Sequence, residues 1–286
     1  MANVLLAWNN RADLATLSGG SWAATLPITN LQNRQVQKVA RTAGVALSDT
    51  VITADFGTAQ SINCIALVVH NLSESAKVRI TAASNSAFTS PEYQSAWIEV
   101  WPAGLINAHL LEWEDDNFWL GTMSSEQRAG YNAPLLHVLP APIYMRYWRV
   151  EIDDVGNPAG YVQVGRLFVA KSWQPQYNMV YGAALGFEDP SETVTSLGGA
   201  EYFDVRGRYR VHRFALEVLS QDERYTYIHE LQRLVGTTGE VLVVPDPADH
   251  STLIQRSFVG RLRSLDAPAQ PHYRIFSANF EIKELL

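Results

Sequence analysis

Cysteine is almost absent from this chain, whose 286 residues include only Cys64. A single cysteine excludes an intrachain disulfide and a cysteine-rich zinc site. Cys64 lies in the apolar run 62–69. A reactive thiol needs an exposed and electropositive setting, so we interpret Cys64 as a buried strand residue.

Charged residues and long apolar runs are also scarce. Charged residues make up 18% of the chain, and the formal net charge is -7. Phosphate binding needs concentrated Lys and Arg, so we expect no sequence-specific nucleic-acid binding. No run approaches the roughly 20 apolar residues of a membrane span, and the amino terminus lacks the pattern of a signal peptide. We therefore expect a protein made in the cytoplasm, without a membrane span.

The motifs of common enzymes and metal sites are missing as well. There is no HExxH zinc motif, no GxSxG elbow and no glycine-rich phosphate loop. The acidic run 112–116 favours a solvated or interface loop over paired catalytic carboxylates, which normally stand on separate strands; a calcium ion is the less favoured alternative. The segment 246–250 favours a turn over a metal site. We predict no enzyme, no cofactor and no metal.

What the chain does contain is strand-like sequence, and its length suffices for two domains. We place the boundary near 173–177, giving domains 1–175 and 176–286. Short strand-like segments separated by turns dominate the first domain, which predicts an antiparallel sandwich or jelly roll. The run 62–69 is apolar on both faces and predicts a central strand. The predicted strands are 51–55, 62–69, 77–83, 97–100, 147–152 and 161–170.

The second domain combines strands with one helix, and predicts a β-sandwich or barrel carrying that helix. Ser220 and Glu223 form a capping box that starts a helix over 220–235, and Gly236 ends it. Residues 176–206 are interpreted as an extended arm that lies on a neighbouring subunit. The last strand alternates, with Phe276, Ala278, Phe280 and Ile282 on one face. The predicted strands are 209–219, 240–244, 252–265 and 272–285.

Four segments of the first domain resemble the discoidin-like, galactose-binding jelly roll. They are Val51–Gly57 with its Asp-aromatic-Gly turn, the apolar run 62–69, Tyr147–Ile152 and Val162–Val169. The resemblance covers roughly residues 30–170. That family's ligand residues lie in variable loops, so the resemblance assigns none of them here.

The second domain resembles the tail-tube-type domain of bacteriophage baseplates, found in distal tail and minor tail proteins of long-tailed phages. Arg213–Glu217, Leu231–Gly236, Val243–Asp246 and Gly260–Leu262 carry this resemblance. The usual distal tail protein has its ring-forming domain first, whereas here the order is reversed. The resemblance implies a structural protein of the virion tail tip.

Two functions remain open from these observations. The resemblance implies a ring that joins the tail tube to the tip complex, a hexamer with a trimer as the alternative. Its partners would be further copies, tail tube proteins and tail hub proteins. The sheet edges and the arm 176–206 would bury surface between copies. The alternative is a carbohydrate-binding module that adheres to host surface glycans.

Two groups of residues are candidates for these roles. Trp97, Trp101, Trp113 and Trp119 crowd one stretch, and Trp113 and Trp119 are the candidates for stacking on a glycan. Core or subunit contact is favoured over a glycan site, because Trp is enriched in both. Alternation along a strand would place Arg206, Arg208 and Arg210 on one face, where they would pair with acidic residues of a neighbouring subunit. A channel for DNA is the less favoured role.

Overall fold

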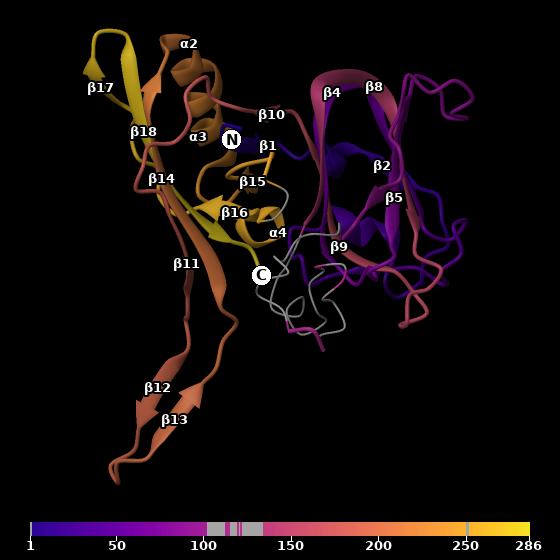
Figure 1. The fold of residues 1–286 in the computed structure, drawn as a ribbon, viewed down its shortest axis with the longest axis horizontal. Coiled ribbons are helices and arrows are strands. Elements are labelled where there is room, and N and C mark those ends of the chain that lie inside the picture. The colour runs from indigo at the N-terminus through magenta and orange to yellow at the C-terminus, as the bar shows by residue number, and fades with distance from the viewer. Residues whose placement is uncertain (1, 102–111, 115–118, 120, 122–133, 250–251) are drawn as a thin grey trace.

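The computed structural model describes residues 2–101, 112–114, 119, 121, 134–249 and 252–286. In this part of the chain, two large antiparallel sheets lie side by side (Figure 1). A third, two-stranded sheet projects from the second one. The predicted fold class, mainly β with antiparallel sheets and a helix in the second half, is confirmed.

The first sheet is built around two long strands. The predicted strands 51–55 and 62–69 are one strand, β4 (Val51–His70), with a register shift between Asp55 and Gln60 where it pairs with β8 (Leu135–Asp153). The sheet has the order β3-β9-β4-β8-β5-β6, with β2 added to β4 and β7 to β5. The other strands are β2 (Thr16–Ser18), β3 (Ala40–Arg41), β5 (Lys77–Ala83), β6 (Tyr93–Gln94), β7 (Ile98–Glu99) and β9 (Gln163–Ala170).

The second sheet takes one strand from the start of the chain. Its order is β10-β1-β15-β16-β18-β14-β11, with β17 added to β18. Leu6 lies opposite both Trp173 and Val243, so residues 5–8, assigned above to the segment 1–175, pair within the sheet of the second half. The strands are β1 (Leu5–Trp8), β10 (Ser172–Trp173), β11 (Ala184–Glu188), β14 (Tyr209–Leu219), β15 (Val241–Val244), β16 (Phe258–Leu262), β17 (Ala269–His272) and β18 (Ile275–Glu284).

The predicted helix is present and begins as expected. The Ser220 hydroxyl accepts from the Glu223 amide, and the Glu223 carboxylate accepts from the Ser220 amide. The helix comprises α2 (Gln221–Glu223), a π-helical turn η4 (Arg224–His229) and α3 (Glu230–Val235). It ends at Gly236, whose φ is 57°. Among the residues that the structure describes, no helix is long and apolar enough to cross a membrane.

The strand predicted over 252–265 is wrong at its start. Residues 253–256 form a short helix, α4 (Leu253–Arg256), and only 258–262 are a strand. The carbonyls of Ile254 and Gln255 both accept from the Arg210 guanidinium, at 3.1 and 3.0 Å. Successive carbonyls of a strand point in opposite directions, so a helical turn brings these two together. The described part of the chain also contains two short 3-10 helices, η1 (Arg11–Leu14) and η2 (Ile28–Gln32).

Three apolar clusters hold the molecule together, and β4 belongs to two of them. Ile65 and Leu67 face the core of the first half. Cys64, Ala66 and Val68 face the opposite way, against the second sheet. The prediction of a strand covered on both faces is therefore confirmed, and its second cover is the other half of the molecule. The third cluster lies between the second sheet and the helix, and includes Phe214, Leu231, Phe276, Ala278, Phe280 and Ile282.

A buried charge cluster also links the two sheets. Arg166 of β9 has a fully buried side chain, and its Nη2 lies 2.6 Å from Glu240 Oε2, immediately before β15. Its Nη1 lies 2.7 Å from Asp13 Oδ1. Burial raises the pKa of Glu240, and the nearby Arg166 opposes that rise. Arg166 thus neutralises the charge of Glu240. Burying this carboxylate without a partner from the other half would be costly.

Candidate functional site

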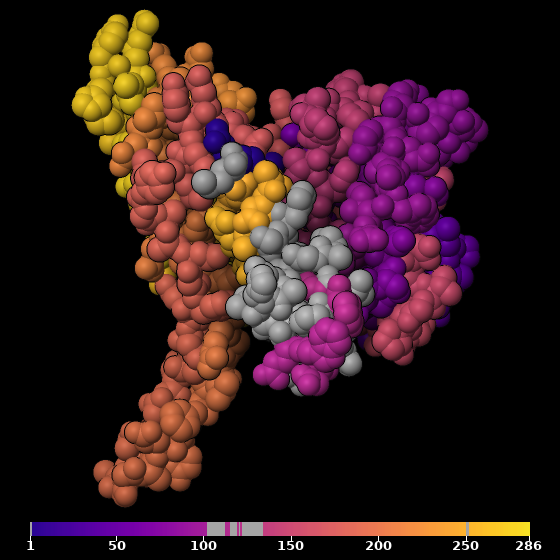
Figure 2. All heavy atoms as spheres, viewed as in Figure 1, coloured from indigo at the N-terminus to yellow at the C-terminus, as the bar shows by residue number. Residues whose placement is uncertain are grey.

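A hairpin that leaves the body of the protein is its most distinctive surface. Beyond β11, residues 189–208 form what we call the arm, in which β12 (Glu192–Thr195) pairs with β13 (Glu201–Asp204). Figures 1 and 2 show the arm pointing away from both sheets. Its turn is closed by hydrogen bonds between Ser196 and Ala200 and from Gly199 to Ser196. Of the predicted arm 176–206, residues 184–188 pair with β14 of the same chain, and only the part beyond them leaves the body, as a β-hairpin.

The arm exposes large apolar side chains on both of its faces. Val194 lies opposite Tyr202 on one face, and Phe203 lies on the other. Their exposed fractions are 62%, 65% and 64%, and Val205 and the turn residue Leu197 are more exposed still. A lone two-stranded hairpin is at best marginally stable in water, and this one gains little from burial within its own chain. Its apolar residues are available for a partner.

The sequence carries a signal for this hairpin that the prediction of an extended arm did not use. Two short segments rich in β-branched or aromatic residues, 192–195 and 201–204, flank Gly198 and Gly199, which is a typical hairpin pattern. In the structure, Val194 pairs with Tyr202, and Thr193 with Phe203. Because the hairpin was not predicted, five candidate residues were not predicted either: Val194, Leu197, Tyr202, Phe203 and Val205.

The two arginines of the arm pair with acids of the same arm. Arg206 Nη2 lies 2.8 Å from Asp204 and 3.1 Å from Glu192, and Arg208 Nε lies 2.9 Å from Asp189. Hydrogen bonds from Ser191 and then from Arg208 lower the pKa of Asp189 to about 2. Exposed pairs of this kind add little stability. A contact of Arg206 or Arg208 with a neighbouring subunit stays a prediction.

The expectation that Arg210 joins them on one face is wrong. Arg210 is 1% exposed and lies in β14, whereas Arg206 and Arg208 precede that strand. Its Nη2 lies 2.5 Å from Glu284 Oε1, and its Nη1 donates to the carbonyl of Ser257 at 3.2 Å. Because these groups enclose the guanidinium within its own chain, Arg210 is removed from the candidate interface.

A ring of alternating charges fastens the base of the arm to the sheet. Glu188, at the end of β11, contacts Arg213 at 3.1 Å and Arg263 at 2.7 Å. Both arginines also lie 2.9 Å from Glu281 of β18. The hydrogen bond from Arg263 is the main reason why the pKa of Glu188 is lowered. These contacts fix where the arm leaves the body.

The four tryptophans separate into two pairs. Trp101 is buried and donates to the Leu72 carbonyl at 3.1 Å, and the Trp97 ring lies 4.5 Å from the Arg79 guanidinium. Trp113 and Trp119 are 67% and 75% exposed. Their rings meet edge to face, with centroids 5.1 Å apart. Of the two pairs, Trp113 and Trp119 form the one in which both side chains are largely exposed.

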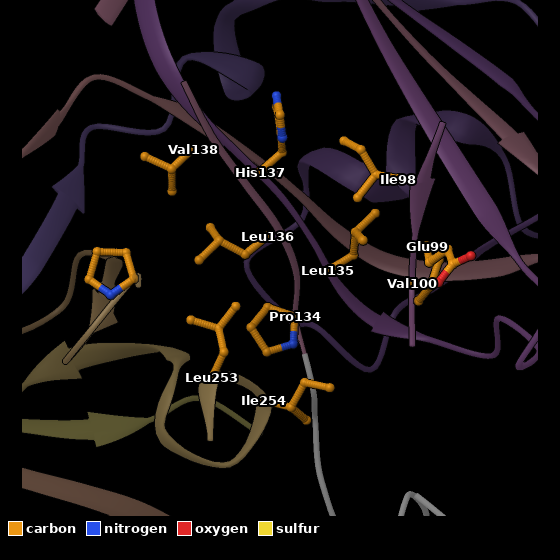
Figure 3. A pocket seen from close by; sticks show the side chains of 11 residues that line it. Ile98, Glu99, Val100, Pro134, Leu135, Leu136, His137, Val138, Leu253 and Ile254 are labelled. Atoms are coloured by element: carbon orange, nitrogen blue, oxygen red, sulfur yellow. The ribbon is translucent and has the colours of Figure 1, made fainter. Parts of the chain in front are cut away.

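A cavity of about 490 Å³ lies between the two halves of the molecule (Figure 3). Residues 98–100 and 134–138 line it from the first half, and Pro247, Leu253 and Ile254 from the second. The His137 ring bonds the Tyr93 hydroxyl at 2.7 Å, and burial lowers the pKa of His137. Among the described lining residues, Glu99 is the one carboxylate, so they assemble no pair of carboxylates for acid–base chemistry.

The other segments weighed for chemistry remain without an assembled site. Asp246 Oδ1 accepts from the amides of Ala2 and Ala248, as expected for a turn, and His250 lies outside the described residues. Glu112 and Glu114 are exposed, while Asp115 and Asp116 lie outside the described part. Within the described residues, no three His, Cys, Asp or Glu side chains gather as a metal site would require. Burial raises the pKa of the Cys64 thiol to about 12.

Comparison with known proteins identifies neighbours by structure alone. No protein-family model matches the chain, and no curated protein matches it. Among solved structures, it is similar to a family 32 carbohydrate-binding module from a family 31 glycoside hydrolase of Clostridium perfringens. That likeness has a TM-score of 0.38 and 11% identity, and covers 57% of this chain and 99% of that one.

Two further neighbours are also carbohydrate-binding modules. One is the family 32 module of C. perfringens NanJ in complex with galactose, with a TM-score of 0.38, 14% identity, and coverage of 58% of this chain and 99% of that one. The other is chitosan-binding module 1 from a chitosanase/glucanase of Paenibacillus sp. IK-5, with a TM-score of 0.35, 15% identity, and coverage of 57% and 99%. These likenesses concern the fold alone.

Proposed function

We propose that this protein is a structural component that assembles with copies of itself through the arm. The observation that carries the proposal is the exposure of Val194, Leu197, Tyr202, Phe203 and Val205 on a hairpin that projects from the body. Burying a side chain of this size is worth about 1.5–3 kcal/mol. Several such groups, buried against a neighbouring copy, offset the cost of ordering an arm of this kind.

We further propose that the assembly is a ring in the tail tip of a long-tailed phage. This part of the proposal rests on the resemblance of the second half to tail-tube-type domains. On this proposal, the protein acts in the virion and contacts tail tube and tail hub proteins. Six copies are proposed, with three as the alternative. A scaffold of this kind needs no catalytic group, and we assign none.

The test compares the intact protein with a variant that lacks the arm. Ser191 Oγ accepts from the Arg206 amide at 2.9 Å, so residues 192–205 can be replaced by an Asn-Gly turn without disturbing the base of the hairpin. We expect closed oligomers of the wild type, by solution mass and negative-stain imaging, and monomers of the shortened variant. A shortened variant with the wild-type mass would contradict the proposal.

A pair of single substitutions provides a matched control. Phe203 of the arm and Leu14 of the body are both exposed, at 64% and 76%. Phe203→Ser should weaken assembly, whereas Leu14→Ser removes a comparably exposed apolar group away from the arm and should leave it unchanged. Equal effects of the two would mean that the arm has no special part in the contact.

Glycan binding is the second proposed function, and it rests on the exposed pair Trp113 and Trp119. Sugars stack on exposed aromatic faces. Because the two indoles meet edge to face, the face of one ring and the edge of the other lie side by side. We expect the wild type to bind members of a glycan array, and Trp113→Ala with Trp119→Ala to abolish that binding. A double variant that binds the same glycans with unchanged affinity would remove this site.

A further inference from the structure

A cleft at the base of the arm has the charge and the apolar surface to receive an arm from another copy. This root cleft, of about 370 Å³, lies where the arm meets the end of the second sheet. Its lining includes Arg206, which pairs with Glu192 and Asp204, and Glu284, which pairs with the buried Arg210. Two further cations, Arg261 and Lys283, lie there beside the apolar Leu285 and Leu286. None of the four is fully buried, so the cleft presents these groups to a ligand from outside.

Unlike Arg206, Arg261 and Lys283 of the root cleft lack an acidic partner among the described residues. The Arg261 guanidinium donates to the carbonyl of Thr237 at 3.3 Å, and the Lys283 ammonium lies 3.8 Å from the centroid of the Tyr209 ring. No ion pair to a carboxylate is formed by either one within the part of the chain that the structure describes. An anionic group would therefore complete the cleft.

The arm carries the complementary groups in one row. Glu201 and Phe203 alternate within β13, so they share a face of the hairpin, and Val205 follows just after the end of that strand. All three are exposed, and Glu201 forms no ion pair with a described residue, unlike Glu192 and Asp204 on the opposite face. A carboxylate followed by an aromatic ring and an aliphatic group matches a cleft made of cations and leucines.

This match cannot be made within one chain. Glu201 lies five positions before Arg206, itself part of the root cleft, a span of about 17 Å in an extended chain. The arm also points away from the body that carries the cleft (Figure 2). The occupant must therefore be the arm of another molecule, and such a contact joins two different surfaces, so it closes into a ring when the rotation permits.

We propose that Glu201, Phe203 and Val205 of one copy dock into the root cleft of the next, with Glu201 pairing with Lys283 and Arg261. This inference rests on the proposed self-assembly and names the surface that receives the arm. The partner is a second copy of this chain, recognised by an opposite charge and by apolar side chains on both sides of the contact.

Charge reversal on each side tests the docking. Lys283→Glu and Glu201→Lys should each weaken self-association about tenfold or more, because each places like charges opposite one another. The double variant restores opposite charges between positions 201 and 283 and should recover most of the lost association, although Arg261 keeps its charge in every variant. Lys38→Glu, at an exposed position of the first half, changes the net charge as Lys283→Glu does and should have no effect.

Mixing the two single variants gives a sharper result. The reversed arm of the Glu201→Lys variant fits the reversed cleft of the Lys283→Glu variant, and the unchanged arm of the second fits the unchanged cleft of the first. The mixture should therefore form rings in which the two variants alternate. Such rings need an even number of copies, which a hexamer provides and a trimer does not. Mass photometry of each variant and of the mixture measures all of these outcomes.

The possible failures can be told apart. Single variants that assemble like the wild type would overturn the docking proposal and leave self-assembly through the arm intact. Single variants that are impaired but are not rescued by the double variant would also overturn it, once equal thermal midpoints show that all are folded. A wild type that stays monomeric at every concentration would overturn both proposals.

Discussion

Replacing Arg166 by methionine should destabilise the protein strongly, and more at high pH than at low pH. The guanidinium is fully buried between the two sheets, and Glu240, its partner at 2.6 Å, has a side chain only 4% exposed. Asp13, at 28% exposure, can regain water when the arginine is lost. Glu240 cannot, so Arg166→Met leaves one carboxylate buried without a counter-charge.

The expected size of the effect follows from that arrangement. Removing one partner of a buried ion pair costs about 3–5 kcal/mol. A change of 1 kcal/mol moves the thermal midpoint of a chain of this size by about 2–4 °C, so we expect a fall of about 6–20 °C near pH 8. A loss of this size is a large part of the free energy of unfolding of an ordinary protein.

The pH dependence separates an electrostatic cost from a loss of packing. Burial already raises the pKa of Glu240, and loss of Arg166 should raise it further. A carboxyl whose pKa is higher in the folded than in the unfolded state stabilises the fold at low pH, and this stabilisation is lost as the pH rises through the folded-state pKa. The deficit of Arg166→Met should therefore be smaller by about 1–3 kcal/mol at pH 5 than at pH 8.

Urea unfolding of the wild type and the variant at both pH values measures these quantities. The double variant Arg166→Met with Glu240→Leu removes both buried charges, and should recover most of the lost stability. The reasoning is refuted if Arg166→Met costs less than about 1 kcal/mol at pH 8, or if its deficit is the same at both pH values.

Three further perturbations have defined outcomes. Gly236→Ala should cost about 1–3 kcal/mol in urea unfolding, because φ is 57° and ψ is -149° at this helix end, a region that only glycine adopts readily; no loss would contradict the strain. Cys64 should resist thiol reagents at pH 7.5 until the protein unfolds, since burial raises its pKa to about 12; labelling of the native protein would count against this. Burial lowers the pKa of His70 and of His212 to about 4, so the unfolded state takes up protons first. Stability is then fully present above about pH 6.5 and falls towards pH 4, by up to about 3 kcal/mol per residue; a flat profile of urea midpoints would exclude it.

The elements that the sequence predicted best are those specified by local signals. The capping box at Ser220 and Glu223 and the glycine at 236 act within a few residues, so the bounds of the helix were close to those observed. The last strand alternates with period two, and its apolar face is the one buried against the helix. Both patterns depend on neighbours along the chain and on nothing distant.

The failures come from contacts between distant segments. Arg210 shares its alternation with His212, Phe214 and Leu216, the inner face of β14, but burial of a charge there depends on Glu284, far along the chain. The helical turn at 253–256 likewise supplies carbonyls that accept hydrogen bonds from Arg210. No local pattern predicts either arrangement, because the sequence around a buried charged residue does not distinguish it from an exposed one unless its partner is known.

The candidate site was predicted in part. Composition and glycines indicated an extended arm over 176–206, and the structure shows a hairpin within that range. The root cleft combines Pro190, Arg261 and Leu286, which lie in three separate parts of the sequence. Only the packing of β14, β16 and β18 brings such residues together.

The position of β1 has a consequence for how this chain folds. Leu6 and Val243 are neighbours in the sheet although more than two hundred residues separate them. Closing so long a loop carries an entropic cost and slows folding. The first sheet can form while the ribosome is still adding residues, but β1 has to wait for β15. Until then, the apolar outer side of β4 and β9 has no cover. A fragment beginning after residue 8 would lack the part of that cover supplied by Leu5 and Ala7, and its second sheet would lack the strand that joins β10 to β15.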